Sequence, residues 1–189
     1  MIELKLKKTL LRLDFSFFAV IALFLLLDTT GFGIMALAAC AVHELAHMLV
    51  MAVFGISADE ITFYGAGIRI TAQTEFARPA VKALILSAGC AANFVSALFL
   101  FRLDFTAAAV SLFTGMFNLL PIGELDGAGL LRLAVIKRCK PENVDGIMRY
   151  TSIAFSVFCL AAAVILGRGL SFTFITTALY FIIVSSRRI

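Results

Sequence analysis

Charged side chains are scarce in this chain of 189 residues. They make up 15% of it, while 62% of the residues are hydrophobic. A soluble domain of ordinary composition is about half apolar and about a quarter charged. The composition therefore argues against an ordinary soluble domain. It predicts an all-α polytopic membrane protein that forms a single domain over residues 1–189.

Paired cysteine motifs and a leader cleavage site are also missing. The four cysteines form no CxxC pair, and three lie in apolar segments, which argues against a disulfide framework. The basic start "ELKLKKTLLR" and the apolar run after it resemble a signal peptide. However, "LLLDTTGFG" after the run contains no small-x-small cleavage site. We therefore expect a retained first membrane helix.

Apolar runs recur along the chain at lengths near the roughly 20 residues that a membrane crossing needs. The six candidate spans are residues 14–27, which are short unless "LLRL" extends them, 33–54, 80–101, 105–120, 150–166 and 170–186. With six crossings, all 16 basic residues except Arg102 and Arg168 fall on the side of the termini. The positive-inside rule then places both termini in the cytoplasm. Because the basic residues lie between apolar segments, the net charge of +4 does not indicate a nucleic-acid partner.

Residues 57–79 differ from these runs, since they are rich in β-branched and aromatic side chains and alternate in "GIRIT". They predict two short strands with a bend, a small membrane-associated β-hairpin on the cytoplasmic side. The N-terminal "IELKLKK" also alternates and could add a strand. The basic segment 137–149 is expected to be a loop, with residues 141–146 as a loop or short surface helix, followed by a C-terminal helix pair over 150–186.

Histidine is almost absent, and the two that exist form one motif. His43, Glu44 and His47 make an HExxH sequence inside an apolar run. On a helix, positions i and i+4 share a face, so two imidazoles there can bind one Zn²⁺, and the glutamate can take a proton from the attacking water. A polar cluster that holds helices together is the alternative. Cys40 could share this face as a ligand, although a small buried apolar side chain is its ordinary interpretation.

A catalytic zinc site needs a third protein ligand, and no histidine remains to supply it. The ligand must be Asp, Glu or Cys. The stretch "FNLLPIGELDGAGLL" interrupts an apolar region with polar and helix-breaking residues and carries Glu124 and Asp126. Irregular backbone at membrane depth is tolerated where protein buries it or where it lines a wet cavity. Either carboxylate could therefore complete the site.

HExxH together with Asn-x-x-Pro-x-x-x-Leu-Asp-Gly resembles the site-2 protease family of intramembrane zinc metalloproteases. The second motif is present as Asn118, Pro121, Leu125, Asp126 and Gly127, and the resemblance covers about residues 33–131. The chain departs from the family at Leu119, where a second proline is common. It departs again in "AGCAAN", where Cys90 replaces a proline.

The resemblance implies roles for individual residues. Glu44 would be the catalytic base, and His43, His47 and Asp126 would be the ligands of one Zn²⁺. Asn118 would help to hold the substrate backbone or the oxyanion. Asn93 would either contact substrate or form an interhelical hydrogen bond. The edge of the hairpin, with Gly65 and Gly67, would either pair with an extended substrate or cap the cavity.

The expected activity is zinc-dependent intramembrane cleavage of membrane-anchored proteins. The absence of PDZ-like and CBS-like segments makes the chain resemble the minimal branch that contains the sporulation pro-sigma-factor protease. We therefore expect a multi-pass protein of the bacterial cytoplasmic membrane, gated by a membrane regulatory partner or by the helix bundle itself. A non-proteolytic zinc-binding regulator, a metal transporter, and a peptidase acting on small peptides or lipoproteins are the alternatives. A transporter is less favoured because residues 150–166 and 170–186 contain no acid or histidine.

Overall fold

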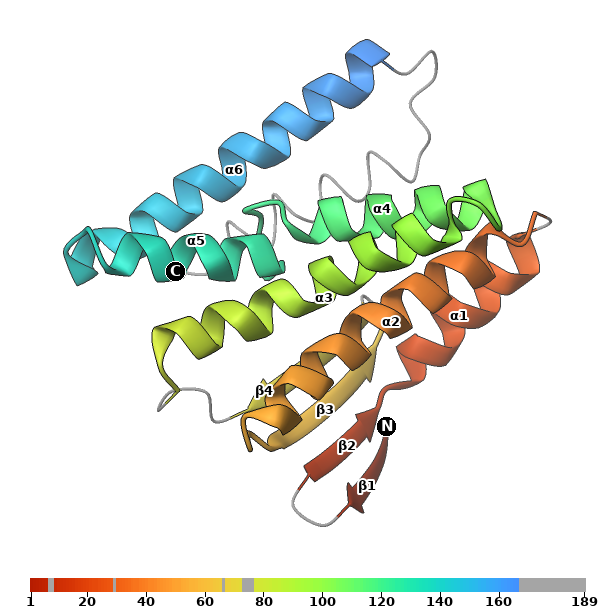
Figure 1. Cartoon of the computed structure of the whole chain (residues 1–189), viewed down its shortest axis with the longest axis horizontal. Helices are drawn as coiled ribbons and strands as arrows, with labels where there is room; N and C mark the ends of the chain where they lie inside the picture. The colour runs from red at the N-terminus through yellow and green to blue at the C-terminus, as the bar shows by residue number, and fades with distance from the viewer. Residues whose placement is uncertain (7–8, 29, 66, 73–76, 167–189) are drawn as a thin grey trace. The chain divides into compact units, whose positions relative to one another are not determined.

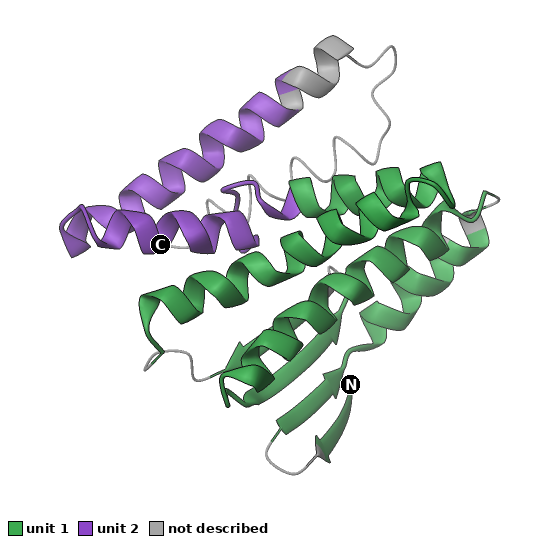
Figure 2. Cartoon of the chain, viewed as in Figure 1, with its two compact units in different colours: residues 1–116 green, residues 117–189 purple. Residues whose placement is uncertain are grey.

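The computed structural model describes residues 1–6, 9–28, 30–65, 67–72 and 77–166. Within these residues, six helices and four strands follow one another in the order β1-β2-α1-α2-β3-β4-α3-α4-α5-α6 (Figure 1). They form two compact units, residues 1–116 and 117–189 (Figure 2). The predicted C-terminal span 170–186 lies outside the described residues. The grouping of the whole chain into a single domain stays a prediction.

The described residues are mostly helical, as predicted, but the expected hairpin is part of a larger mixed sheet with the strand order β1-β2-β3-β4. The strands are β1 (Ile2–Leu6), β2 (Thr9–Leu13), β3 (Ala58–Tyr64) and β4 (Gly67–Ala72). The predicted hairpin is present as the antiparallel pair β3–β4. The suggested N-terminal strand is also present, and it pairs with a second strand that contains "LLRL".

Strand β2 pairs in parallel with β3, and a helical crossover connects the two. Arg12 of β2 bridges both neighbouring strands. Its Nε lies 3.0 Å from Glu3 Oε1 and its guanidinium 2.7 Å from Glu60 Oε1. Cross-strand charge pairs of this kind stabilise a sheet face. The residues that could have lengthened the first helix are thus used to widen the sheet.

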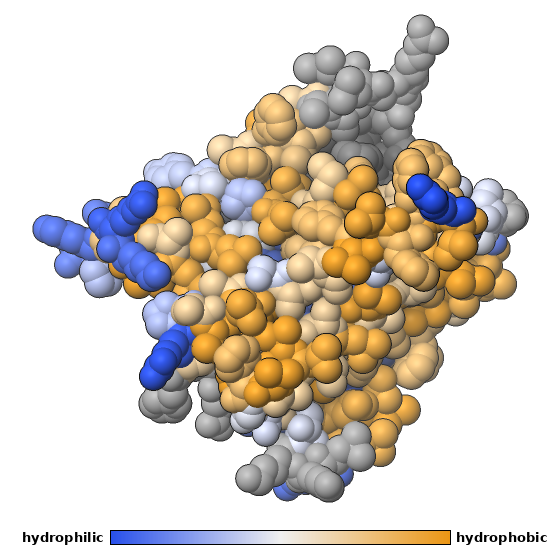
Figure 3. Space-filling model, viewed as in Figure 1, coloured by the Kyte–Doolittle hydropathy of each residue, from blue (hydrophilic) through white to orange (hydrophobic). Residues whose placement is uncertain are grey.

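Among the described residues, two helices are long and apolar enough to cross a membrane, α2 (Phe32–Val53) and α3 (Pro79–Leu100). They match the predicted spans 33–54 and 80–101. Their surfaces are largely exposed and apolar, with Leu49 68% and Leu98 80% accessible, and hydrophobic residues cover much of the face seen in Figure 3. Such surfaces are stable in lipid rather than water, which indicates a membrane protein.

The other helices of the predicted spans are shorter or differ in extent. Helix α1 (Phe15–Leu27) has 13 residues and α4 (Phe105–Asn118) has 14. At 1.5 Å per residue these are shorter than a hydrocarbon core of about 30 Å. Six crossings are therefore not confirmed and stay a prediction.

Asp28 caps the turn between α1 and α2. Its carboxylate accepts hydrogen bonds from the Thr30 hydroxyl at 2.8 Å and from the Gly33 amide at 2.6 Å. The Thr30 hydroxyl, followed by the backbone amides of Gly33 and Thr30, lowers the pKa of Asp28 from 3.8. Helix starts favour such acceptors.

We expect Asp28→Ala to lower the melting temperature of the purified protein at neutral pH. Because the folded-state pKa of Asp28 is depressed, its contribution is present above pH 3.8 and is lost as the pH falls through the folded value. Melting curves at neutral and acidic pH check this. A difference between variant and wild type that did not shrink in acid would contradict the capping role.

Within the second unit, α5 (Asp126–Ile136) packs against α6 (Pro141–Leu166). Residues 141–146 are helical, which is one of the two structures expected for them, and the loop predicted over 137–149 ends at Pro141, where α6 begins. Pro is well suited to a first helical position, and Glu142 lies in the first turn, where a negative charge is favourable. Arg132 of α5 pairs with Asp145 of α6 at 2.8 Å.

Candidate metal centre

The two histidines lie on one buried stripe of α2. Ala39, His43, His47 and Met51 recur at four-residue intervals and are the buried positions of the central and final turns. This spacing places them on the same helix face. His43 and His47 are 4% and 8% exposed in a helix whose other faces are largely accessible. The motif therefore points toward protein and away from the surroundings.

The ring nitrogens of the pair face each other. Nε2 of His43 lies 3.1 Å from Nε2 of His47, with the ring planes at 77°. The Nδ1 atom of His47 contacts the Ile85 carbonyl oxygen at 2.7 Å. Since a carbonyl only accepts, His47 Nδ1 carries the hydrogen and its Nε2 keeps a lone pair. The sequence predicted that the two imidazoles share a face, and the structure brings their Nε2 atoms together.

Helix α3 packs against α2 beside this pair. Its buried positions Ile85, Gly89, Asn93 and Ala97 also recur every four residues. A Cβ on Gly89 would lie 2.5 Å from His47 Nε2 and 2.6 Å from His43 Nε2. A side chain at this position would displace the two rings. Gly89 thus leaves the space that the two ring nitrogens border.

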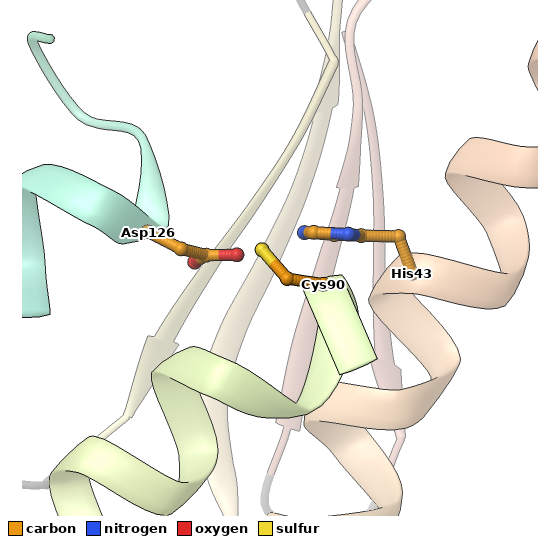
Figure 4. Close-up of side chains that lie close together, drawn as sticks. All are labelled: His43, Cys90 and Asp126. Carbon is orange, nitrogen blue, oxygen red and sulfur yellow. The ribbon is translucent and has the colours of Figure 1, made fainter. Parts of the chain in front are cut away.

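Asn93 and Cys90 flank this space. Asn93 is completely buried, and its amide nitrogen lies 3.3 Å from His43 Nδ1. Cys90 is also buried, and its Sγ lies within 4.8 Å of a His43 ring nitrogen. Figure 4 shows the ends of the His43 side chain on α2 and the Cys90 side chain on α3 close together. The sequence interpretation missed Cys90, although its place in "AGCAAN", where the family has proline, was a signal.

Cys40 and Glu44 occupy other positions on α2. Cys40 is exposed, whereas His43 is buried, so the interpretation of Cys40 as a ligand gains no support. Glu44 directly follows His43 and is half-buried. Its carboxylate is therefore not enclosed between the two helices. A group that exchanges protons with water needs such access.

The predicted second motif lies at the end of α4 and the start of α5. Asn118 is the last residue of α4, and Asp126 is the first residue of α5 and half-buried. Glu124 is exposed. Figure 4 shows Asp126 at the beginning of its helix. The sequence predicts irregular backbone within residues 117–131, and the structure differs from Asp126 onward, where α5 begins.

The loop between these helices is bonded to α6, which belongs to the same unit. Gly123 adopts a left-handed φ of 57°, and its amide donates to the Ser152 hydroxyl of α6 at 2.7 Å. Gly127 lies so close to the preceding turn that a Cβ would be 1.9 Å from the Leu119 carbonyl oxygen. The glycine that follows Asp126 is thus required for packing, because only a residue without a Cβ lets the start of α5 lie against the backbone of Leu119.

We expect Gly127→Ala to disrupt the local structure around Asp126, because the clash is with backbone that cannot rotate away. The purified variant should melt at a lower temperature and be cut by added protease between Asn118 and Asp126. Gly129→Ala, a neighbouring substitution on the same helix, is the comparison. Wild-type melting and protease resistance in Gly127→Ala would contradict the packing argument.

The hairpin glycines have different surroundings. The Gly65 amide donates to the Ser16 hydroxyl at 3.0 Å, and a Cβ on Gly65 would lie 3.3 Å from Ser16 and Val20 side-chain atoms of α1. Gly65 therefore packs against α1. Gly67 begins β4, which pairs with β3 and lies at the edge of the sheet among the described strands. A substrate role for either glycine stays a prediction.

Comparison with solved structures gives a match over almost the whole chain. The site-2 protease from Methanocaldococcus jannaschii superposes with a TM-score of 0.73 and 17% sequence identity, covering 98% of this chain and 93% of that one. No protein-family profile and no curated protein sequence matches. The chain therefore has the fold of that site-2 protease, and the resemblance noted in the sequence is confirmed at the level of the fold.

Proposed function

We propose that this chain is a zinc-dependent intramembrane endopeptidase that cleaves membrane-anchored proteins in or near their transmembrane segments. One observation carries the proposal. Two buried imidazoles face each other across 3.1 Å inside a helix that is long and apolar enough to span a membrane. Ionisable groups at such positions are costly and usually functional. The fold shared with a site-2 protease supports the same activity.

The histidine pair fits zinc. Zn–N bonds are about 2.0–2.1 Å long, so nitrogen atoms 3.1 Å apart can both bond one ion. The Ile85 carbonyl fixes the hydrogen of His47 on Nδ1, which leaves Nε2 as the donor atom. Gly89 keeps the adjoining space free of side-chain atoms.

We propose Asp126 as the third ligand, as the family resemblance implies. Its half-buried carboxylate suits this role better than that of Glu124, which is exposed. Its position at the start of α5 is fixed by the tight packing of Gly127. Two histidines and one carboxylate would leave a fourth position open for water, as catalytic zinc sites do.

When bound, zinc would polarise the scissile carbonyl and lower the pKa of the attacking water toward about 7. Glu44 would then accept the proton of that water and pass it to the leaving amine. Asn118 would hold the substrate backbone or the developing oxyanion. Each of these roles belongs to a residue of the matched motifs.

The sheet is the proposed contact for the unwound part of the substrate. A helical substrate hides its carbonyls in hydrogen bonds, so it must become extended to be cut. Strand β4 offers an edge that such a segment could join, near Gly67. A hollow of about 330 Å³ separates the last turns of α2 from β2 and β3 and is lined by Met48, Met51 and Ile61. It could receive an apolar substrate side chain.

The proposed setting is the bacterial cytoplasmic membrane. The distribution of basic residues supports a multi-pass topology with both termini in the cytoplasm. The partners would be a membrane-anchored protein substrate, the lipid bilayer and a membrane regulator, and no nucleic acid.

A non-proteolytic zinc-binding regulator is the second candidate, and Cys90 favours it. A thiolate close to His43 could fill the fourth coordination position. Zinc sites with four protein ligands are typically structural and closed to substrate. Cys90→Ala separates the candidates, since it should leave zinc binding intact in a protease and weaken it in a closed site.

The ligand assignment is tested by zinc analysis of purified Asp126→Asn. We expect its zinc content to fall well below that of wild type, while Glu124→Gln and the control Glu142→Gln, at an exposed acid of α6, retain zinc. Full zinc in Asp126→Asn with loss in Glu124→Gln would transfer the role to Glu124. Full zinc in both would exclude this motif from the metal centre.

A further inference from the structure

One face of α3 carries the groups that contact both histidines. Ile85, Gly89 and Asn93 are spaced by four residues. The Ile85 carbonyl contacts His47 Nδ1, Gly89 lies beside both Nε2 atoms, and the Asn93 amide lies at His43 Nδ1. The Ile85 carbonyl belongs to the backbone, so any residue at position 85 would provide it. The space beside the Nε2 atoms requires only that position 89 is glycine. Asn93 is the one side chain in this set that reaches a ligand.

The hydrogen bonds of the pair form a consistent chain without metal. A neutral His47 that donates from Nδ1 to the Ile85 carbonyl can only accept at Nε2. The 3.1 Å contact between the rings then requires His43 to donate from Nε2. His43 Nδ1 is left with a lone pair, and the Asn93 amide nitrogen at 3.3 Å donates to it.

Metal binding requires the opposite tautomer of His43. Its Nε2 must give up the hydrogen to bond the ion, and a neutral ring then carries the hydrogen on Nδ1. The partner at Nδ1 must therefore change from donor to acceptor. The Asn93 Oδ1 atom is buried and has no hydrogen-bond partner among the described residues. A half-turn of the amide places this oxygen at Nδ1.

We propose that Asn93 is a positioning residue that matches both tautomers of His43, donating to Nδ1 without metal and accepting from Nδ1–H when zinc is bound. An amide is suited to this because one end donates and the other accepts. This inference rests on the proposed metal centre. The contact with His43 is the interhelical hydrogen bond that the sequence offered as one alternative for Asn93, and the inference gives this bond a role in metal binding.

The test is zinc affinity of the purified, detergent-solubilised full chain, measured by competition with a chromogenic chelator. Asn93→Leu removes both hydrogen-bonding ends at similar volume and should weaken zinc binding by roughly 10–100-fold, as loss of a partner behind a ligating histidine usually does. Asn93→Asp supplies acceptors only and should bind zinc at least as tightly as wild type. Ser87→Ala on the same helix is the control, since that hydroxyl bonds the Leu84 carbonyl of its own helix.

Cobalt substitution adds a second readout. Co²⁺ absorption bands report ligand geometry, so Asn93→Asp should keep the wild-type spectrum and Asn93→Leu should alter it. Helix content by circular dichroism shows whether each variant is folded. Equal zinc affinity in folded Leu and Asp variants, or equal weakening in both, would overturn the inference. Absence of zinc from wild type would instead overturn the proposed metal centre itself.

Discussion

Replacing Gly89 by alanine is expected to remove bound zinc while the helices still fold. The new Cβ would lie 2.5 and 2.6 Å from the Nε2 atoms of His47 and His43, inside the space that these atoms border. Both rings are the ends of flexible side chains, so they can rotate away from the methyl group. The backbone can therefore stay in place, but the two nitrogens can no longer point at one ion.

Gly146→Ala is the matched control for this substitution. Gly146 lies within α6, and a Cβ there would meet nothing within 4 Å. Alanine in a helix interior is favoured over glycine by about 0.5–1 kcal/mol. The control should keep its zinc and melt slightly higher. Wild-type zinc affinity in folded Gly89→Ala would contradict the placement of α3 against the histidine pair.

Glu44→Gln is expected to abolish cleavage and leave zinc bound. The amide keeps the shape of the side chain but cannot accept the proton of the attacking water. Loss of a general base typically costs about 10²–10⁴-fold in rate. The zinc content should equal that of wild type, because the proposed ligands are His43, His47 and Asp126.

The measurement compares cells that carry wild type with cells that carry Glu44→Gln. Membrane-anchored proteins that accumulate with the variant are candidate substrates, and each is then incubated with the purified enzymes. Glu142→Gln, at an exposed acid of α6, is the control. Cleavage by Glu44→Gln at the wild-type rate would contradict the catalytic assignment, and unchanged zinc would separate this from a metal-binding defect.

The parts of the fold predicted well are those that one local pattern determines. Long apolar runs predicted α2 and α3 to within one residue at each end. Alternation predicted the β3–β4 hairpin, whose strands are adjacent in sequence. The HExxH spacing predicted that His43 and His47 share a face, because helix geometry alone decides it.

The errors occurred where a distant partner decides the structure. "LLRL" has high helix propensity, but it forms β2 because β3, more than forty residues later, pairs with it. The start of α6 contains charged residues that interrupt the apolar pattern. It is helical in the structure, where Asp145 of α6 forms an ion pair with Arg132 of α5. For Asn93, the sequence could not decide between a substrate contact and an interhelical hydrogen bond. No local pattern shows that its amide lies at His43 Nδ1.

Zinc K-edge absorption spectroscopy of the purified wild-type protein tests the central claim most directly. We predict one zinc bound by two imidazoles and by oxygen at about 2.0–2.1 Å, with no sulfur neighbour. A sulfur shell at about 2.3 Å would show that Cys90 closes the site, and fewer than two imidazoles would show that His43 and His47 do not share the ion.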